Sequence, residues 1–199
     1  MRRTTTLLLI VATMSIAACS GDADEPSEET AAAAAVELGP ELLAASGFEA
    51  GVEAEWLVEA EDPGQIAQIA GDGDGNSFIE MSAELAEEAR WPQVIQQGRI
   101  PLIAGERYRL ALRARSDDFG LVFASVAFED ASGDEFLALG PGSLTVDSSE
   151  WTDYHFAFEA PDGAAAGYVI LRLALNKAMT DEQFLSADVD DVSLKRIER

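Results

Sequence analysis

Cysteine and histidine, the residues that most often carry metal, redox or nucleophilic chemistry, occur once each, as Cys19 and His155. The chain has no CxxC, HExxH or GxSxG pattern. A glycosidase would need two carboxylates about 5 to 9.5 Å apart, one of them with a raised pKa. The pairs Glu129-Asp130 and Asp134-Glu135 lie next to turns, where both carboxyls would be solvated and ionised. We therefore expect a binding protein with no catalytic residues rather than an enzyme.

The net charge is the strongest feature of the composition. The 199 residues include 13 Lys and Arg against 37 Asp and Glu, which gives a formal charge of −24. Such a surface repels the phosphate backbone of nucleic acids and disfavours anionic membrane surfaces. With 48% hydrophobic and 25% charged residues, the chain has the composition of one globular domain.

The first nineteen residues have the pattern of an export signal. Arg2 and Arg3 precede an apolar run at 7–12, and small residues lead to Cys19. This pattern resembles a bacterial lipoprotein signal, which implies removal of residues 1–18, lipidation of Cys19 and a lipid anchor in the membrane. Ser20 next to the cysteine implies the outer membrane of the cell envelope. The alternative is a plain secretory signal with a chance cysteine.

Residues 19–40 are expected to be an acidic linker. Positions 20–37 combine small, acidic and proline residues and contain little that could be buried. The folded domain is then expected at 41–199.

The main body predicts an all-β fold. Residues 108–114 alternate between apolar and polar types, so Tyr108, Leu110 and Leu112 fall on one face and Arg109 and Arg113 on the other. Further strands are expected at 120–129, 151–159, 168–175 and 187–196, separated by turn residues. Residues 82–90 are the exception, since their Ala, Glu and Leu content favours a helical insertion or an irregular loop.

Five short motifs occur in a characteristic order over residues 42–196: 46–49 with Trp56, 75–79, 100–115, 151–156 and 187–194. In this order they resemble the carbohydrate-binding modules of families four, nine and twenty-two, which are galactose-binding-like jelly rolls. The resemblance implies a jelly-roll β-sandwich in which aromatic rings stack on sugars while amide, carboxylate and guanidinium groups bind hydroxyls.

The resemblance implies a carbohydrate site made of Trp91, Gln93, Gln97, Arg113 and Arg115. Each has an alternative role. Trp91 could cap the edge of the sandwich, the two glutamines could be solvated, and the arginines could form salt bridges on an acidic protein. Among the other aromatic residues, Trp56 and Trp151 match core positions of the family, and the lone His155 is expected to pack or hydrogen-bond.

Many members of these families bind structural calcium, and Glu49 and Asp191 match their carboxylate positions. Backbone carbonyls of 73–76 could complete the shell. The loop at 72–76 is not an EF-hand, because that motif requires glycine where Ser77 lies and glutamate where Ala83 lies. A structural Ca²⁺ is the one cofactor that the sequence suggests.

These features predict non-catalytic polysaccharide binding by an envelope-anchored lipoprotein. The alternative is an envelope scaffold whose sandwich binds another protein and no sugar. The sequence does not choose between them, because only Trp91 can be assigned to a sugar-binding face.

Overall fold

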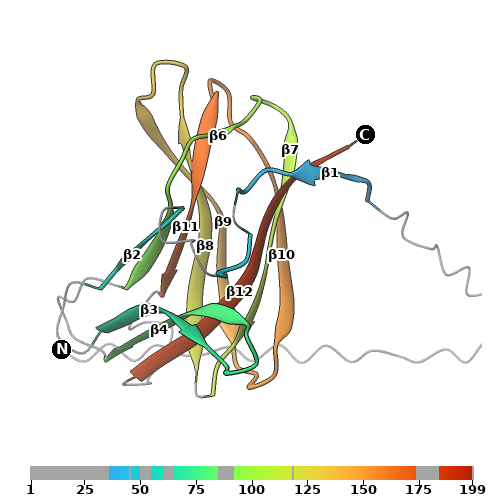
Figure 1. Ribbon diagram of the computed structural model, residues 1–199. Coiled ribbons are helices and arrows are strands. Elements are labelled where there is room, and N and C mark those ends of the chain that lie inside the picture. The colour runs from blue at the N-terminus through green and yellow to red at the C-terminus, as the bar shows by residue number, and fades with distance from the viewer. Residues whose placement is uncertain are drawn as a thin grey trace, which may run out of the picture. The chain divides into compact units, whose positions relative to one another are not determined.

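The computed structural model describes residues 36–44, 46–49, 55–60, 65–84, 92–117, 119–173 and 184–198. These residues form two six-stranded antiparallel sheets that pack as a β-sandwich (Figure 1). The all-β expectation is confirmed. None of the described segments is a helix of the length and hydrophobicity needed to cross a membrane.

Sheet A has the strand order β10-β7-β12-β4-β3, and β1 also pairs with β12. Its strands are β1 (Leu38–Glu41), β3 (Gln65–Gly71), β4 (Ser77–Glu84), β7 (Arg107–Arg115), β10 (Thr152–Glu159) and β12 (Phe184–Ile197).

Sheet B has the order β2-β5-β11-β8-β9, and β6 also pairs with β11. Its strands are β2 (Trp56–Glu59), β5 (Gln93–Gln96), β6 (Ile100–Pro101), β8 (Gly120–Glu129), β9 (Glu135–Val146) and β11 (Ala166–Leu173).

Alternation of residue types decides which side of each strand faces the other sheet. In β7 the predicted apolar side, including Tyr108, Leu110 and Leu112, is buried. The strands expected at 120–129, 151–159, 168–175 and 187–196 correspond to β8, β10, β11 and β12 within a few residues. The core between the sheets includes Trp56, which is fully buried and packs on Phe48 with 5.2 Å between ring centroids.

The expectation of a helix or loop at 82–90 is wrong at its start. Ser82, Ala83 and Glu84 end strand β4, where Ala83 pairs with Leu185 of β12 and is fully buried. Burial of this face and pairing on both sides override a weak local helix propensity. Residues 85–90 lie outside the described part.

Strand β1 begins at Leu38, inside the segment 19–40 that the sequence assigned to a linker. Leu38 lies opposite Ile197 in β12. The Glu41 carboxylate accepts hydrogen bonds from the Ser193 hydroxyl at 2.5 Å and the Leu194 amide at 2.9 Å. These contacts join the start of the domain to its last strand.

A β-bulge interrupts β12 at Asp190 and Asp191. Asp190 lies opposite Arg113 and Ser193 opposite Ala111, so β12 carries one residue more than β7 over this stretch. Asp191 has a φ of 50°, a left-handed conformation uncommon outside glycine. The buried Asp190 carboxylate accepts hydrogen bonds from the Asn76 amide at 3.1 Å and the Asp191 backbone at 2.7 Å, which hold the bulge in place.

Candidate functional site

A row of four side chains crosses the outer face of sheet B, the face that points away from sheet A. Glu59 of β2 lies directly opposite Gln93 of β5, Gln93 opposite Arg172 of β11, and Arg172 opposite Phe123 of β8. Three strand spacings separate the ends of the row, about 14 Å in all. The row places carboxylate, amide and guanidinium groups that are part-buried beside an aromatic ring that is exposed.

Hydrogen bonds fix the polar part of this row. The Gln93 amide nitrogen donates to Glu59 at 2.6 Å, and its carbonyl oxygen accepts from Nε and Nη2 of Arg172 at 3.2 and 2.8 Å. These bonds use one of the two amide hydrogens of Gln93 and two of the five N–H groups of Arg172. The remaining N–H groups and the second Glu59 oxygen can bind hydroxyl groups in a fixed geometry.

The apolar part of the face lies beside this polar row. The Phe123 side chain is 37% exposed, and Leu57, two residues before Glu59 on β2, is 41% exposed. Leu57 lies opposite Ile95, and Ile95 lies opposite Ile170. An exposed ring beside fixed hydrogen-bonding groups can hold a ligand that has both an apolar face and hydroxyls.

The structure separates the residues predicted for the carbohydrate site. Gln93 belongs to the row just described. Gln97 follows β5, where its side chain is exposed and its backbone amide donates to the Glu55 carbonyl at 2.6 Å. Trp91 lies outside the described residues. Arg113 and Arg115 are on the outer face of sheet A, so they share no face with Gln93.

Both arginines are held by neighbouring side chains. Arg115 Nε pairs with the Asp188 carboxylate at 2.9 Å, and its guanidinium lies 4.6 Å from the ring centroid of Trp151 and 5.1 Å from that of Phe78. Arg113 pairs with Asp191 at 3.2 Å and also lies over the Trp151 ring, 5.5 Å from its centroid. Both arginines therefore form salt bridges, the role that the sequence offered as the alternative to sugar binding.

Burial raises the pKa of the Asp188 carboxyl, while the hydrogen bond and charge of Arg115 oppose that effect. Glu80 and Asp117 add to the increase. Asp188 is therefore an ion-pair partner in an acidic neighbourhood.

The two tryptophans expected in the core differ. Trp56 is buried there, as expected. Trp151 is only half-buried and directly precedes β10, on the outer face of sheet A, so the core expectation is wrong for it. Trp151 is surrounded by the two arginines and by the Phe78 ring, whose centroid lies 5.7 Å from that of Trp151. A core position would instead have apolar neighbours on all sides. His155, also on β10, is exposed.

The two residues predicted to bind calcium are both exposed. Asp191 pairs with Arg113, and the residues that the structure describes contain no group of three or more acidic, histidine or cysteine side chains arranged for a metal. The loop at 72–76 is a turn between β3 and β4, in which the Asp72 carboxylate accepts a hydrogen bond from the Asp74 amide at 3.0 Å. The calcium site stays a prediction.

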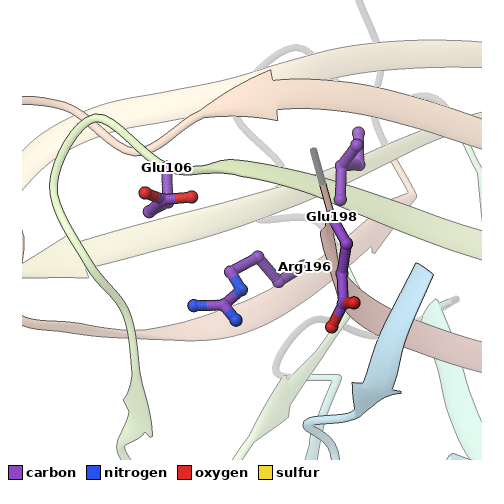
Figure 2. A pocket seen from close by; sticks show the side chains of 4 residues that line it. Glu106, Arg196 and Glu198 are labelled. Atoms are coloured by element: carbon purple, nitrogen blue, oxygen red, sulfur yellow. The ribbon is translucent and has the colours of Figure 1, made fainter. Parts of the chain in front are cut away.

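A pocket of about 350 Å³ lies where β7 begins and β12 ends, lined by Glu106, Arg196, Ile197 and Glu198. Figure 2 shows the Arg196 guanidinium between the side chains of Glu106 and Glu198. No aromatic ring is among these lining residues, so the pocket lacks the stacking surface that Phe123 gives to sheet B.

Sequence reasoning missed Glu59, Arg172 and Phe123. Arg172 was within the strand expected at 168–175, on the polar side of its alternation, and this signal could have placed it on an outer face. Nothing local could have placed Glu59 or Phe123 beside it, because β2, β11 and β8 are far apart in the sequence.

No protein-family model and no curated protein matches the chain. Among solved structures, it is similar to the CBM22-1 xylan-binding domain of Paenibacillus barcinonensis Xyn10C, with a TM-score of 0.53 and 10% identity, covering 82% of this chain and 97% of that one. The C-terminal family 22 carbohydrate-binding module of Clostridium thermocellum Xyn10B has a TM-score of 0.52 and 14% identity, covering 76% and 90%.

A third structure contains the CBM22-1 and GH10 modules of that Clostridium thermocellum xylanase with xylohexaose. Its TM-score is 0.54 and its identity 17%, and the match covers 80% of this chain but 29% of the longer one. At these identities the similarity establishes the fold. The described part of the chain is an all-β, two-sheet antiparallel sandwich that resembles the family 22 jelly roll.

Proposed function

We propose that this protein binds a polysaccharide without cleaving it, on the outer face of sheet B. The observation that carries the proposal is the row of Glu59, Gln93, Arg172 and Phe123, in which fixed polar groups adjoin an exposed ring. Sugars present hydroxyls at their edges and C–H groups on their faces. The polar groups of the row can bind the hydroxyls, and the Phe123 ring can stack on the C–H face. The fold adds support, since the similar solved domains include xylan-binding modules.

The test is binding of the purified full-length chain to a panel of soluble neutral polysaccharides that includes xylan. Phe123→Ala should weaken binding about tenfold, since the loss of one ring contact of about 1.4 kcal/mol corresponds to that factor. Arg172→Ala should weaken it by a similar amount, because it removes donors and releases Gln93.

Matched controls lie on the other sheet. Phe184 is 41% exposed on sheet A, and Arg113 lies on the outer face of the same sheet, so Phe184→Ala and Arg113→Ala repeat the two substitutions away from the proposed site. Equal losses in the variants and their controls, or no binding by a folded wild-type chain across the panel, would reject the proposal. The second outcome would favour an envelope scaffold that binds protein.

The location of the protein is a separate part of this proposal. We infer a lipid anchor at Cys19 that holds the domain at the cell envelope, with Ser20 directing it to the outer membrane. The support is the sequence pattern alone. Metabolic labelling with a fatty-acid analogue in a bacterial host should mark the wild-type chain but not Cys19→Ala, and labelling of both would refute the anchor.

A calcium ion at Glu49 and Asp191 is likewise proposed from the family resemblance. Addition of Ca²⁺ to chelator-treated protein should raise its melting temperature, and Glu49→Gln should reduce that increase. An unchanged melting temperature in the wild-type chain would exclude a structural ion of useful affinity.

A further inference from the structure

Six strands of the described sandwich have a neighbour on one side only: β1, β2, β3, β6, β9 and β10. An exposed edge can pair with another chain, and proteins block such edges with charges, prolines, bulges or short strands. Five of the six edges carry a block: Pro40 and Glu41 in β1, Glu59 in the short β2, Pro101 in β6, Pro141 and a register shift in β9, and Asp153 and Glu159 in β10.

Strand β3 lacks every one of these blocks. Its seven residues, QIAQIAG, contain no charge and no proline, and its register with β4 continues without a shift from Gln65 to Gly71. Among the described strands, it is the edge best suited to accept another strand.

The sequence of β3 fits a second copy of itself. In an antiparallel pair centred on Gln68, Ile66 of one copy would lie opposite Ala70 of the other, and Ala67 opposite Ile69. Each such pair combines a large and a small apolar residue on the same side of the sheet, so neither side is overcrowded or left empty. A two-fold axis through Gln68 gives a closed, isologous dimer.

The surface next to β3 also favours this arrangement. A groove of about 480 Å³ on the outer face of sheet A has an apolar part at Ile66, Ala70, Phe78 and Phe184, and its other lining residues include the carboxylates of Glu80, Asp117 and Asp188. Ile66 is 43% exposed there. Because Ile66 of the second copy would lie beside Ala70, its side chain would face the apolar part of this groove.

We propose that two copies of this chain pair antiparallel through β3 and join their six-stranded sheets A into one continuous sheet. This interface leaves the outer face of sheet B uncovered, so the proposal is independent of polysaccharide binding. The net charge of −24 opposes association of like copies. Salt screens that repulsion, so the dimer should be favoured as ionic strength rises.

Sedimentation equilibrium of the full-length chain over a range of concentrations and salt tests the proposal. The Gln68 side chain is exposed and donates to Glu80 at 2.7 Å, so Gln68→Lys keeps a partner for the new side chain within its own copy. Two lysines would then face each other across the axis, and the dimer dissociation constant should rise about fivefold. His155→Lys on the edge strand β10 adds the same charge elsewhere and should leave the constant unchanged.

Disulfide trapping gives a second readout that does not depend on the stability of the lysine variant. Residues directly opposite in an antiparallel pair have Cα atoms about 4.5 or 5.5 Å apart, within reach of a disulfide. In a Cys19→Ser background, Gln68→Cys should form a covalent dimer under mild oxidation and His155→Cys should not. A wild-type chain that stays monomeric at high salt would overturn the proposal, as would equal trapping at both positions or a dimer insensitive to Gln68→Lys.

Discussion

The two outer faces of the sandwich carry the same kinds of side chain in different arrangements. On sheet A, the rings of Trp151 and Phe78 are covered by the Arg113 and Arg115 guanidinium groups, and both cations pair with aspartates. On sheet B, Arg172 is bound by an uncharged amide, and the Phe123 ring beside it is exposed. Cation–π contacts cover ring faces on which a sugar would stack, so Trp151 and Phe78 of sheet A contribute to stability, whereas the exposed Phe123 ring of sheet B is available for a ligand.

The largest expected effect is on the free energy of unfolding, and it compares a ring that packs for stability, Trp151, with a ring proposed to contact a ligand, Phe123. Trp151→Ala should lower the free energy of unfolding by about 2 kcal/mol, less than for a fully buried tryptophan, because Arg113, Arg115 and Phe78 lose their shared contact. Phe123→Ala should cost about 1 kcal/mol, less than Trp151→Ala, because 37% of Phe123 is already exposed to solvent. Urea denaturation measures both. A larger loss of stability for Phe123→Ala would contradict the assigned roles.

The second prediction concerns the two arginines of sheet A. Arg115→Ala should cost about 1 to 2 kcal/mol of stability, because it leaves the partly buried Asp188 carboxylate without its hydrogen bond. Arg113→Ala should cost about 0.5 kcal/mol, since the Arg113 side chain is 40% exposed and its aspartate partners are more exposed still. Neither variant should weaken polysaccharide binding, and a binding defect in either would move the site toward sheet A.

The third prediction compares the two predicted glutamines. Gln93→Leu should weaken polysaccharide binding about fivefold, the equivalent of about 1 kcal/mol for one hydrogen-bonding group. It removes the amide that connects Glu59 with Arg172. Gln97→Leu, beyond the end of β5, should change binding by less than about twofold, within the range of a surface substitution. Isothermal titration with the best polysaccharide from the panel measures both, and the reverse order would show that the site lies nearer the end of β5.

The smallest expected effect is on how the free energy of unfolding depends on pH, and it compares Asp188 of sheet A with Asp130 in a turn of sheet B. Burial raises the pKa of Asp188 above 3.8, so its folded form binds the proton more tightly than its unfolded form. Relative to Asp188→Asn, the wild-type chain should gain stability as the pH falls from the raised pKa toward 3.8.

Asp130, in the turn between β8 and β9, should behave in the opposite way. The Ser132 hydroxyl donates to its carboxylate at 2.6 Å and lowers its pKa below 3.8. Relative to Asp130→Asn, the wild-type chain should keep its extra stability above pH 3.8 and lose it as the pH falls through the lowered pKa. Differences in unfolding free energy across a pH series measure both carboxyls, and slopes of the same sign would contradict the assignment.

Several features of the fold could be predicted from residue patterns that are local in the sequence. Alternation around Tyr108 and Leu110 predicted the buried side of β7, and runs of β-branched and aromatic residues between turns predicted β8, β10, β11 and β12. The prediction was wrong where a long-range contact outweighed a local preference, as at Ala83, whose burial against β12 made a strand of residues that favour helix. It was also wrong at Trp151, because its neighbours Arg113 and Arg115 come from β7.

The sequence by itself determined that the main body consists of antiparallel strands, each with an apolar and a polar side, because side chains alternate across a strand with a period of two. It determined the large negative charge and the signal-like start of the chain as well. Only the tertiary structure decided which sheet each strand joins, and so which polar sides share a face. It placed Arg113 away from Gln93 and put Arg172 and Phe123 beside it. Alternation shows which residues point outward from their own strand, but the pairing of strands distant in the sequence decides their neighbours.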